Sequence, residues 1–487
     1  MRPFSSMRLC VLALAAFVAL ALAGPAAAER YVVLYKEHGW SVWGAKGDVQ
    51  NAGGSLVAAY PEIDVVVAES SDPGFPARMD RVRGVEGVAA SGSSVASAAG
   101  HSWGGDGGSG HPVSDDDTFS PLQWWSQRIN APDAHAITGG SRKVVVGVID
   151  TGVDPTHPDL DGNIDWSRSA SCVSGAAVRD PAAWNDDSGH GTNVAGVIAA
   201  EANGIGIVGI APNVRLAVVK ASVHSGDSDF FLPDAVICSL MWAADHDVDV
   251  ANNSYSTDSA LSGGTTSFCK NDEEQRVIIK AVGRAVEFAQ RRGVSVVASA
   301  GNDGIDVKDP ANAGCKRLPS QLPGVIAVSS IGLDDRLAAG PPSNVGLGYV
   351  DVTAPGGDFL QGVPPAGLVL GPWPAAFQVP RLLCDPCSGP NPGYYRYFAG
   401  TSQAAAQVSG VAALVVGELE NDDRHRGWWS RGRKADPERV ASIVRRTAEP
   451  LPCPEGDARC VTVGKSTSFY GRGLVDALAA VEAADRD

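Results

Sequence analysis

The sequence predicts an α/β protein with a mostly parallel central sheet, preceded by a small α+β unit. Residues 143–160, KVVVGVIDTGVDPTHPDL, open with a run of Val and Ile before a Gly, which is typical of a strand buried on both faces of a parallel sheet. Residues 192–200, TNVAGVIAA, follow with the spacing of a buried helix. Alternating strand-like and helix-like segments within residues 30–90 predict the small unit.

Within the small unit, YVVLY (31–35), SLVAAY (55–60) and IDVVVAE (63–69) are strand-like, and FPARMDRVRGV (75–85) has helical spacing. From residue 90 to 117 the composition changes to Ser, Gly, Ala and Asp, which is typical of a flexible linker. Two interpretations of this layout are open. The small unit is either a binding module tethered to the large domain or a domain that is removed by cleavage.

The N-terminus has the pattern of a secretory signal peptide. Two arginines precede an apolar run at 9–22, which is short for a membrane span, and Ala26 to Ala28 form a small-residue cleavage site. We therefore expect residues 1–28 to be removed. No other stretch is long and apolar enough to anchor the chain, so we expect a secreted protein, extracellular or periplasmic, without a membrane anchor.

Charge and composition exclude some classes of protein. The 487 residues carry a formal net charge of −16 and give a pI near 5.0, so binding to nucleic acid through electrostatics is not expected. Hydrophobic residues make up 44% of the chain and 57 residues are Gly, which indicates a globular protein with a large core and many tight turns.

An even number of cysteines remains once Cys10 leaves with the signal peptide. In an exported chain this predicts disulfide bonds, and short separations favour the pairs Cys384–Cys387 and Cys453–Cys460. The other four cysteines are Cys172, Cys238, Cys269 and Cys315. A redox pair or half of a zinc site is the alternative for the CDPC motif, but no second CxxC or His pair follows at the spacing of a zinc site.

Residues 398–415, FAGTSQAAAQVSGVAALV, contain a candidate nucleophile. Gly400 and Thr401 form a tight entry, and Ser402 stands where a helix of small and apolar residues begins. Free N–H groups and the positive end of the helix dipole favour the negative charge that develops when a serine attacks a carbonyl. A serine that merely caps the helix is the alternative interpretation.

A candidate acid and a candidate base precede this serine. Asp150 falls at the carboxyl end of the predicted strand, where α/β sheets place functional groups, and His190 lies between glycines at the start of a helix. A turn-capping aspartate and a structural histidine are the alternatives. The chain order Asp, His, Ser differs from the orders of chymotrypsin and of α/β-hydrolases.

The segments VIDTGVD, GHGTNVAG and GTSQAAAQVSG resemble the three active-site blocks of the subtilisin-like serine proteases, the subtilases. The resemblance implies a serine endopeptidase with a subtilisin-like three-layer fold, in which Ser402 is the nucleophile, His190 the base and Asp150 the orienting acid. It also implies that residues 29–90 are an inhibitory, ferredoxin-like prodomain. Residues 91–118 are then a linker with the maturation site, and residues 119–487 the peptidase domain.

The resemblance extends to the oxyanion hole and the substrate cleft. GVSVVASAGNDG (293–304) matches the strand that ends in the oxyanion-hole asparagine, which implies Asn302 together with the Ser402 N–H group. DVANNSYS (249–256) resembles the strand that pairs with extended substrates. The residues thus expected along the cleft are Ser254, Tyr255, Ser256, Ser299, Ala300 and Gly301, with Ser256 replacing the usual glycine.

A structural calcium ion is a further implication of the resemblance. The family's calcium loop follows the histidine helix, and oxygen ligands of this kind suit calcium. The ligands implied here are the Asn203 side chain, the carbonyls of Glu201, Ile205 and Ile207, and the Asp159 carboxylate. A Gly-rich turn without a metal is the alternative.

The chain departs from the family pattern in several places. Gln403, Ala406 and Gln407 replace the usual Met and Pro-His after the serine, which should not prevent catalysis. Insertions span residues 358–397 and 421–436. Each either shapes substrate access or decorates the surface, and surface decoration is the default expectation. Arg317 falls near the pocket for the residue before the scissile bond, which suggests an acidic preference.

We therefore expect a monomeric protease that acts on proteins or peptides and is inhibited by its own prodomain. Two other functions fit the family resemblance: a catalytically silent binding or scaffolding protein, and a processing protease with narrow specificity. Because Asp150, His190, Asn302 and Ser402 are all present, the silent protein is the less favoured of these.

Overall fold

The computed structural model describes residues 28–37, 41–93, 112–226, 228–257, 272–312, 316–361, 366–377, 379, 382–425 and 434–486. The predicted signal peptide, most of the predicted linker, Cys269, Cys315 and the middle of the second insertion lie outside the described residues. No helix within the described ranges has the length and apolar character needed to cross a membrane.

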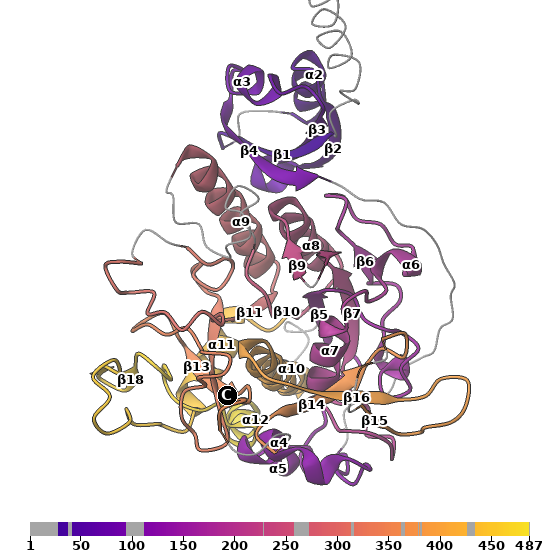
Figure 1. Ribbon diagram of the computed structural model, residues 1–487, viewed down its shortest axis with the longest axis vertical. Coiled ribbons are helices and arrows are strands. Elements are labelled where there is room, and N and C mark those ends of the chain that lie inside the picture. Colours follow the sequence, from indigo (N-terminus) through magenta and orange to yellow (C-terminus); the bar gives the residue numbers. More distant parts are fainter. Residues whose placement is uncertain are drawn as a thin grey trace, which may run out of the picture.

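A seven-stranded sheet forms the centre of the large domain, residues 112–486 (Figure 1). Its order is β13-β12-β11-β10-β5-β7-β6, and every neighbouring pair is parallel, as predicted. The strands are β5 (Val145–Asp150), β6 (Ala170–Ser171), β7 (Arg215–Lys220), β10 (Val250–Asn253), β11 (Ser295–Ser299), β12 (Ile326–Ile331) and β13 (Val352–Pro355). All of β5 is buried, because helices cover both faces of the sheet.

Alternate side chains of β5 enter two separate cores, which makes three layers. Val146 and Val148 pack with one set of helices, whereas Val145 and Ile149 pack with α8 and α9 on the opposite face. The first set is α7 (His190–Ala199), α10 (Thr401–His425), α11 (Pro437–Thr447) and α12 (Ala477–Arg486). The second set is α8 (Pro233–Asp245) and α9 (Glu273–Arg291).

The small domain, residues 28–93, has a four-stranded antiparallel sheet of order β2-β3-β1-β4 and the chain order β-α-β-β-α-β of ferredoxin-like domains. Its elements are β1 (Glu29–Tyr35), α2 (Val42–Asn51), β2 (Ser55–Tyr60), β3 (Val65–Ser70), α3 (Phe75–Met79) and β4 (Val85–Ser93). The three predicted strands are confirmed, but the predicted helix ends early. Gly84, at φ 101°, reverses the chain into β4, which continues past residue 90.

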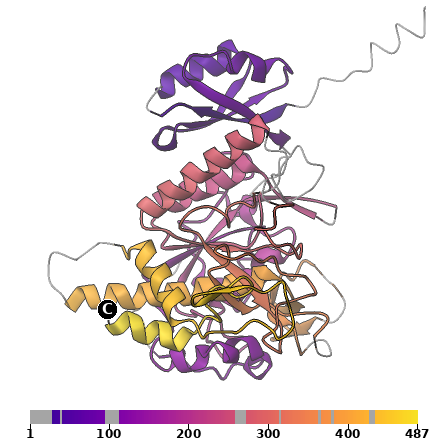
Figure 2. The same cartoon turned by 90° about the vertical axis from the view of Figure 1, so that its left-hand side faces the viewer.

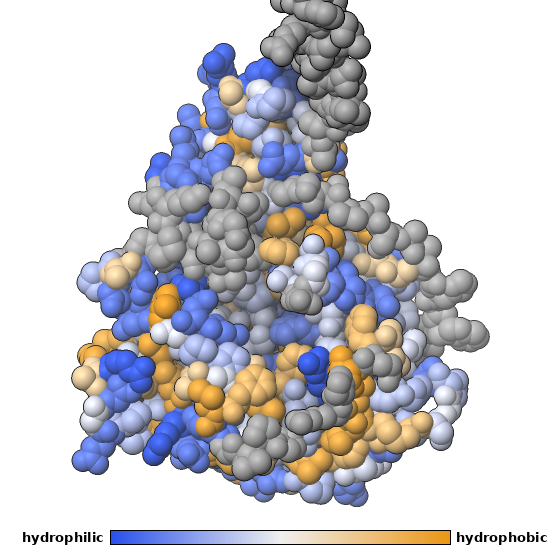
Figure 3. All heavy atoms as spheres, viewed as in Figure 1, coloured by the Kyte–Doolittle hydropathy of each residue, from blue (hydrophilic) through white to orange (hydrophobic). Residues whose placement is uncertain are grey.

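The small domain lies on α8 and α9, with its helices on the far side of its sheet (Figures 1 and 2). Val32 and Leu34 share one buried cluster with Val277 of α9. Gly87 of β4 touches α9 so closely that a Cβ atom there would lie 2.4 Å from Val277. This contact is apolar, whereas hydrophilic and hydrophobic side chains are interspersed over the outer face shown in Figure 3.

A buried ion pair joins the two domains. Arg30 Nε of β1 lies 2.6 Å from Asp234 Oδ2 at the start of α8, and the side chains are 1% and 0% exposed. Ser91 also donates a hydrogen bond of 2.5 Å to Asp234. A second pair across the same contact, Lys280 with Glu86, is largely exposed. Burial makes each charge of the first pair depend on the other for stabilisation.

Three disulfide bonds lie among the described residues. The predicted pairs Cys384–Cys387 and Cys453–Cys460 are confirmed. A third bond, Cys172–Cys238, ties the segment after β6 to α8 beneath the small domain. The CDPC motif is therefore a disulfide in this structure.

The first insertion is not surface decoration, which corrects the sequence interpretation. It folds into a sheet of order β14-β16-β15, with β14 (Val369–Trp373), β15 (Leu383–Cys384) and β16 (Tyr394–Phe398), beside α7 (Figure 1). Every residue of β14 is buried, and a Cβ atom at Gly196 of α7 would lie 2.0 Å from Pro372. The insertion therefore packs against the helix that carries the candidate base.

We predict that Asp234→Asn, in the full chain with Ser402→Ala so that both domains stay joined, lowers the free energy of unfolding by about 3–5 kcal/mol, because it leaves the Arg30 charge buried without a counter-charge. Urea unfolding followed by tryptophan fluorescence measures the change. The matched control is Lys280→Gln, which removes an exposed pair at the same contact and should cost less than about 1 kcal/mol. Equal losses in the two variants contradict the prediction.

Candidate active site

Asp150 and His190 meet at the carboxyl edge of the central sheet. Asp150 is the last residue of β5, and His190 is the first residue of α7. His190 Nδ1 lies 2.7 Å from Asp150 Oδ1, which also accepts a hydrogen bond of 2.7 Å from the Thr151 N–H group. The Asp150 side chain is fully buried, while that of His190 is 22% exposed. The carboxylate thus holds one ring nitrogen and leaves the other side of the imidazole toward solvent.

Asp186 fixes the turn that precedes His190, and sequence reasoning missed this residue. Its carboxylate accepts hydrogen bonds from the N–H groups of Ser188 (3.0 Å), Gly189 (2.8 Å) and Thr192 (3.0 Å). It also accepts from the hydroxyls of Thr192 and Thr151. An aspartate four positions before a predicted helix start is the signal that could have identified this anchor.

Two opposing effects set the proton affinity of His190. Burial disfavours the imidazolium, but the charge of Asp150 and its hydrogen bond outweigh this and raise the pKa of His190 to about 9. The charge of Asp229, on the neighbouring strand β9 (Ser228–Phe231), acts in the same direction. His190 therefore binds a proton more tightly than an ordinary histidine.

Ser402 is the second residue of α10, and its hydroxyl is hydrogen-bonded away from His190. It donates to the Ser254 carbonyl over 2.9 Å, and the Ser254 hydroxyl donates back to the Ser402 carbonyl over 2.9 Å. In the part of the chain that the structure describes, no hydrogen bond joins Ser402 to His190. Ser254, expected to face the substrate, thus has a buried side chain that holds the candidate nucleophile.

Asn302 lies next to the start of α10 with its amide held in one orientation. Its Oδ1 atom accepts hydrogen bonds of 3.0 Å from both the N–H group and the hydroxyl of Thr401. Among the described residues, the Nδ2 group of this exposed side chain donates to no acceptor. The amide therefore presents free donors beside Ser402.

Gln403, one of the departures from the family pattern, links the two site helices. Its side chain donates a hydrogen bond of 3.1 Å to Asn193 of α7, and Asn193 donates in turn to the Arg396 carbonyl of β16 over 3.3 Å. The helix with the candidate nucleophile, the helix with the candidate base and the insertion are thus joined through one asparagine.

The other residues expected along the cleft are mostly buried. Tyr255 stacks on Phe231 with ring centroids 4.2 Å apart and donates a hydrogen bond of 2.9 Å to Asn253. Ser299, Ala300 and Gly301 are buried where β11 ends, and Ser256 is partly exposed. Ser254 is hydrogen-bonded to Ser402, and Tyr255 and Ser256 follow it in the chain. Ser299, Ala300 and Gly301 directly precede Asn302, and Ser256 is the most exposed of the six.

Arg317 does not offer a free charge. Its guanidinium lies 3.0 Å from Asp303, the residue after Asn302, and Arg317 is only 4% exposed. The neighbouring carboxylate neutralises it, so the acidic preference suggested from the sequence loses its basis at this residue.

Trp373 of β14 covers the turn before His190. A Cβ atom at Gly189 would lie 2.4 Å from this indole ring, and Gly189 has a φ of 94°. Both the backbone conformation and the close approach therefore require glycine. Sequence reasoning missed Trp373, because nothing local connects the insertion to the histidine block.

The predicted calcium loop is closed by hydrogen bonds. Asp159 Oδ2 accepts from the Ile207 N–H group over 3.1 Å and from the Tyr395 hydroxyl over 3.0 Å. The Asn203 Oδ1 atom accepts from the Ile205 N–H group over 3.1 Å. Asp159 Oδ2 and Asn203 Oδ1 are therefore engaged within the protein, whereas Asp159 Oδ1 is buried without a hydrogen-bond partner among the described residues.

Tyr395 fills the space beside the loop. A Cβ atom at Gly206 would lie 1.9 Å from its hydroxyl oxygen, and Asp385 of the insertion accepts from the Gly206 N–H group over 3.1 Å. Within the described ranges, no three or more His, Cys, Asp or Glu side chains gather to hold a metal. The structure therefore gives no direct support to calcium binding by the predicted ligand set of Asp159, Glu201, Asn203, Ile205 and Ile207.

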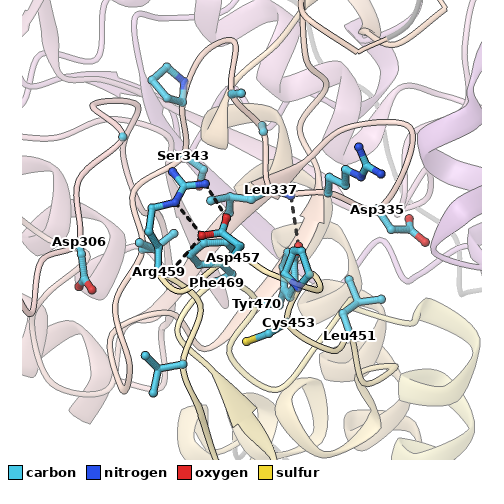
Figure 4. A pocket seen from close by; sticks show the side chains of 18 of the residues that line it. Asp306, Asp335, Leu337, Ser343, Leu451, Cys453, Asp457, Arg459, Phe469 and Tyr470 are labelled. Carbon is cyan, nitrogen blue, oxygen red and sulfur yellow. Dashed lines mark hydrogen bonds and ion pairs between the residues drawn. The ribbon is translucent and has the colours of Figure 1, made fainter.

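A cleft of about 1360 Å³ lies apart from these residues (Figure 4). Asp306, Asp335, Asp457 and Arg459 line it, and Arg459 is paired with Asp457. None of the predicted site residues belongs to its lining, so the candidate active site is the region around Asp150, His190 and Ser402.

Comparison with known proteins relates this chain to serine proteases. Residues 141–473 match the model of the subtilase family. A thermophilic serine proteinase of Bacillus sp. (strain AK1) is 32% identical over 309 residues, which cover 63% of this chain and 60% of that protein. Subtilisin Savinase of Lederbergia lenta is 31% identical over 361 residues, which cover 74% of this chain and 98% of that protein.

Among solved structures, the epidermin leader peptide processing serine protease of Staphylococcus aureus has a similar fold. The TM-score is 0.66, with 23% identity, and the match covers 94% of this chain and 99% of that chain. Against the Bacillus proteinase, by contrast, this chain matches less than two thirds of the relative's length.

We predict that removing calcium with EDTA leaves the thermal midpoint of the protein unchanged, because hydrogen bonds from Tyr395 and the loop backbone close the Asp159 loop. Tyr395→Phe should lower the free energy of unfolding by roughly 1–3 kcal/mol, since Asp159 loses a buried donor. Differential scanning fluorimetry in EDTA and in excess calcium chloride measures both effects.

The matched control is Tyr397→Phe on the same strand, whose hydroxyl has no hydrogen-bond partner among the described residues. It should leave the midpoint unchanged. A midpoint that rises strongly with calcium in the wild-type protein contradicts the prediction.

Proposed function

Because this chain belongs to the subtilase family, we propose that it is a serine endopeptidase that hydrolyses peptide bonds in proteins or peptides through an acyl-enzyme. The observation that carries the proposal is the 2.7 Å hydrogen bond between His190 Nδ1 and the buried Asp150 carboxylate. It favours the tautomer in which His190 Nε2 accepts a proton. The Ser402 hydroxyl, in the first turn of α10, is the proposed nucleophile.

In the first half of the reaction Ser402 is acylated. When substrate binds, the Ser402 hydroxyl leaves the Ser254 carbonyl and turns to His190, which takes its proton as the oxygen attacks the peptide carbonyl. Asp150 orients the ring and stabilises the imidazolium. The tetrahedral intermediate collapses when His190 gives the proton to the leaving amine, which departs with the new N-terminus.

The oxyanion of each tetrahedral intermediate forms beside the start of α10. The free Asn302 Nδ2 group and the Ser402 N–H group donate hydrogen bonds to it, and the positive end of the α10 dipole lies behind them. Water then attacks the acyl-enzyme and gives a proton to His190. His190 returns this proton to the Ser402 oxygen as the acyl bond breaks and the second product leaves as a carboxylic acid.

We also propose that the chain is made as a secreted precursor. Residues 1–28 act as the signal peptide, residues 29–90 as an inhibitory prodomain, and the maturation cut falls within residues 91–118. The apolar contact with α8 and α9 and the buried Arg30–Asp234 pair support a small domain built for this one partner.

The proposal is tested by intact mass and N-terminal sequencing of the secreted protein beside Ser402→Ala. We expect the wild-type protein to begin within residues 91–118 and the variant to keep its small domain. Loss of Ser402 should reduce kcat about a million-fold, which is the magnitude known for subtilisin. Identical maturation of both proteins would mean that another protease makes the cut.

Asn302→Ala is the graded variant in the same experiment. It keeps the nucleophile and base but removes one oxyanion donor, so kcat should fall about 100- to 1000-fold, as it does for the oxyanion-hole asparagine of subtilisin. An unchanged kcat in a folded protein excludes Asn302 from the oxyanion hole.

We predict that kcat/KM rises with pH and reaches half of its maximum near pH 9. The base must be neutral to accept a proton, and the pKa of His190 is raised to about 9, so activity is lost as the pH falls through that value. Initial rates on a peptide without titratable groups give the profile. Asp229→Asn should move the midpoint to lower pH, and Asp485→Asn at the chain end should not. A wild-type midpoint at or below 6.5 contradicts the prediction.

A further inference from the structure

Arg396 is stacked on two aromatic rings beside the candidate active site. Its guanidinium carbon lies 4.6 Å from the centroid of the Trp373 ring and 4.9 Å from that of Phe398. The two rings are 5.5 Å apart and tilted by 32°. We refer to these three residues as the Arg396 cluster.

The charge of Arg396 has no partner among the described residues. Within the described ranges, no carboxylate lies within ion-pair distance of its guanidinium, and no acceptor there receives a hydrogen bond from it. Burial lowers the pKa of Arg396, yet a guanidinium stays charged near neutral pH. Arg128 and Arg317, by contrast, each contact a carboxylate. A partly buried guanidinium without a carboxylate partner can bind an anionic group.

The Arg396 cluster contacts the turn before His190 and lies in the segment that leads into Ser402. Trp373 packs on Gly189, directly before His190, and Phe398 lies four residues before Ser402. Ser254 reaches Ser402 from the β10 side, whereas the cluster lies on the α7 side. His190, on this α7 side, hands its proton to the leaving amine, so the cluster flanks the segment that follows the scissile bond.

We propose that Arg396 binds a carboxylate side chain of the substrate on the leaving-group side, and that the enzyme therefore prefers Asp or Glu at the first or second residue after the scissile bond. This inference rests on the proposed endopeptidase function. It names a substrate class for that function.

The chemistry of the cluster suits this role. Stacking on Trp373 and Phe398 restrains the plane of the guanidinium and leaves its N–H edge available, so a carboxylate can accept two parallel hydrogen bonds. Because the rings exclude water from one side of the charge, the interaction is stronger than at a fully exposed arginine.

The test uses internally quenched peptides that share one sequence and end in a C-terminal amide. They differ only in having Glu or Gln at the first or at the second position after the cleaved bond. For the wild-type enzyme we expect kcat/KM to be at least about tenfold higher for Glu at one of these positions. The ratio should shrink in high salt, because screening weakens the pair. In Arg396→Gln the ratio should fall to about one.

Two variants complete the design. Arg396→Lys keeps the charge without the planar fork, and its ratio should lie between those of the wild type and Arg396→Gln. Arg459→Gln is the matched control, since Arg459 also stacks on a ring, that of Phe469, but lines the cleft of Figure 4. It should keep the wild-type ratio. The Glu-to-Gln ratio does not depend on how much of each variant is folded.

A wild-type ratio near one at both positions, or a ratio that survives in Arg396→Gln, overturns the inference while cleavage of the Gln peptides upholds the proposed function. If the wild-type enzyme cleaves no peptide, the proposed function fails and the inference fails with it.

Discussion

The parallel pairing of β5, β10 and β11 is the constraint on which the candidate site depends. Asn252 of β10 lies opposite Val148 of β5 and Val297 of β11, so all three strands end at one edge of the sheet. Asp150 ends the first strand, and Ser254 and Asn302 follow the other two. A register slip of one residue in β5 would turn Asp150 to the other face, away from His190. The pairing of the strands therefore places these residues together, and the loops only adjust their positions.

The sequence predicts those parts of the site whose signal is local. A run of Val and Ile predicts a buried strand, and Asp150 at its end is found there. A histidine between glycines predicts the start of a helix, and α7 begins at His190. Ser402 likewise stands in the first turn of α10. In each case, backbone preferences within a few residues decide the outcome, so the pattern and the fold agree.

The parts that sequence reasoning missed or misjudged depend on contacts between distant segments. Tyr395 reaches Asp159 from across the chain and closes the loop for which a calcium ion was predicted. Trp373 and Arg396 come from an insertion whose composition indicates only turns and surface. Asp186 was missed for another reason. Its place four positions before the helix was a local signal, but the pattern does not reveal the five hydrogen bonds that give Asp186 its role.

The contact between Gly189 and Trp373 has a consequence for how this protein can change over evolution. A larger side chain at Gly189 collides with the indole ring, and removing the ring leaves a gap above the turn that aims His190. Each position therefore limits what the other tolerates, although they stand in segments far apart in the sequence. In this chain the insertion thus limits which side chains the histidine block can accept, and we expect a change at one of the two positions to need a compensating change at the other.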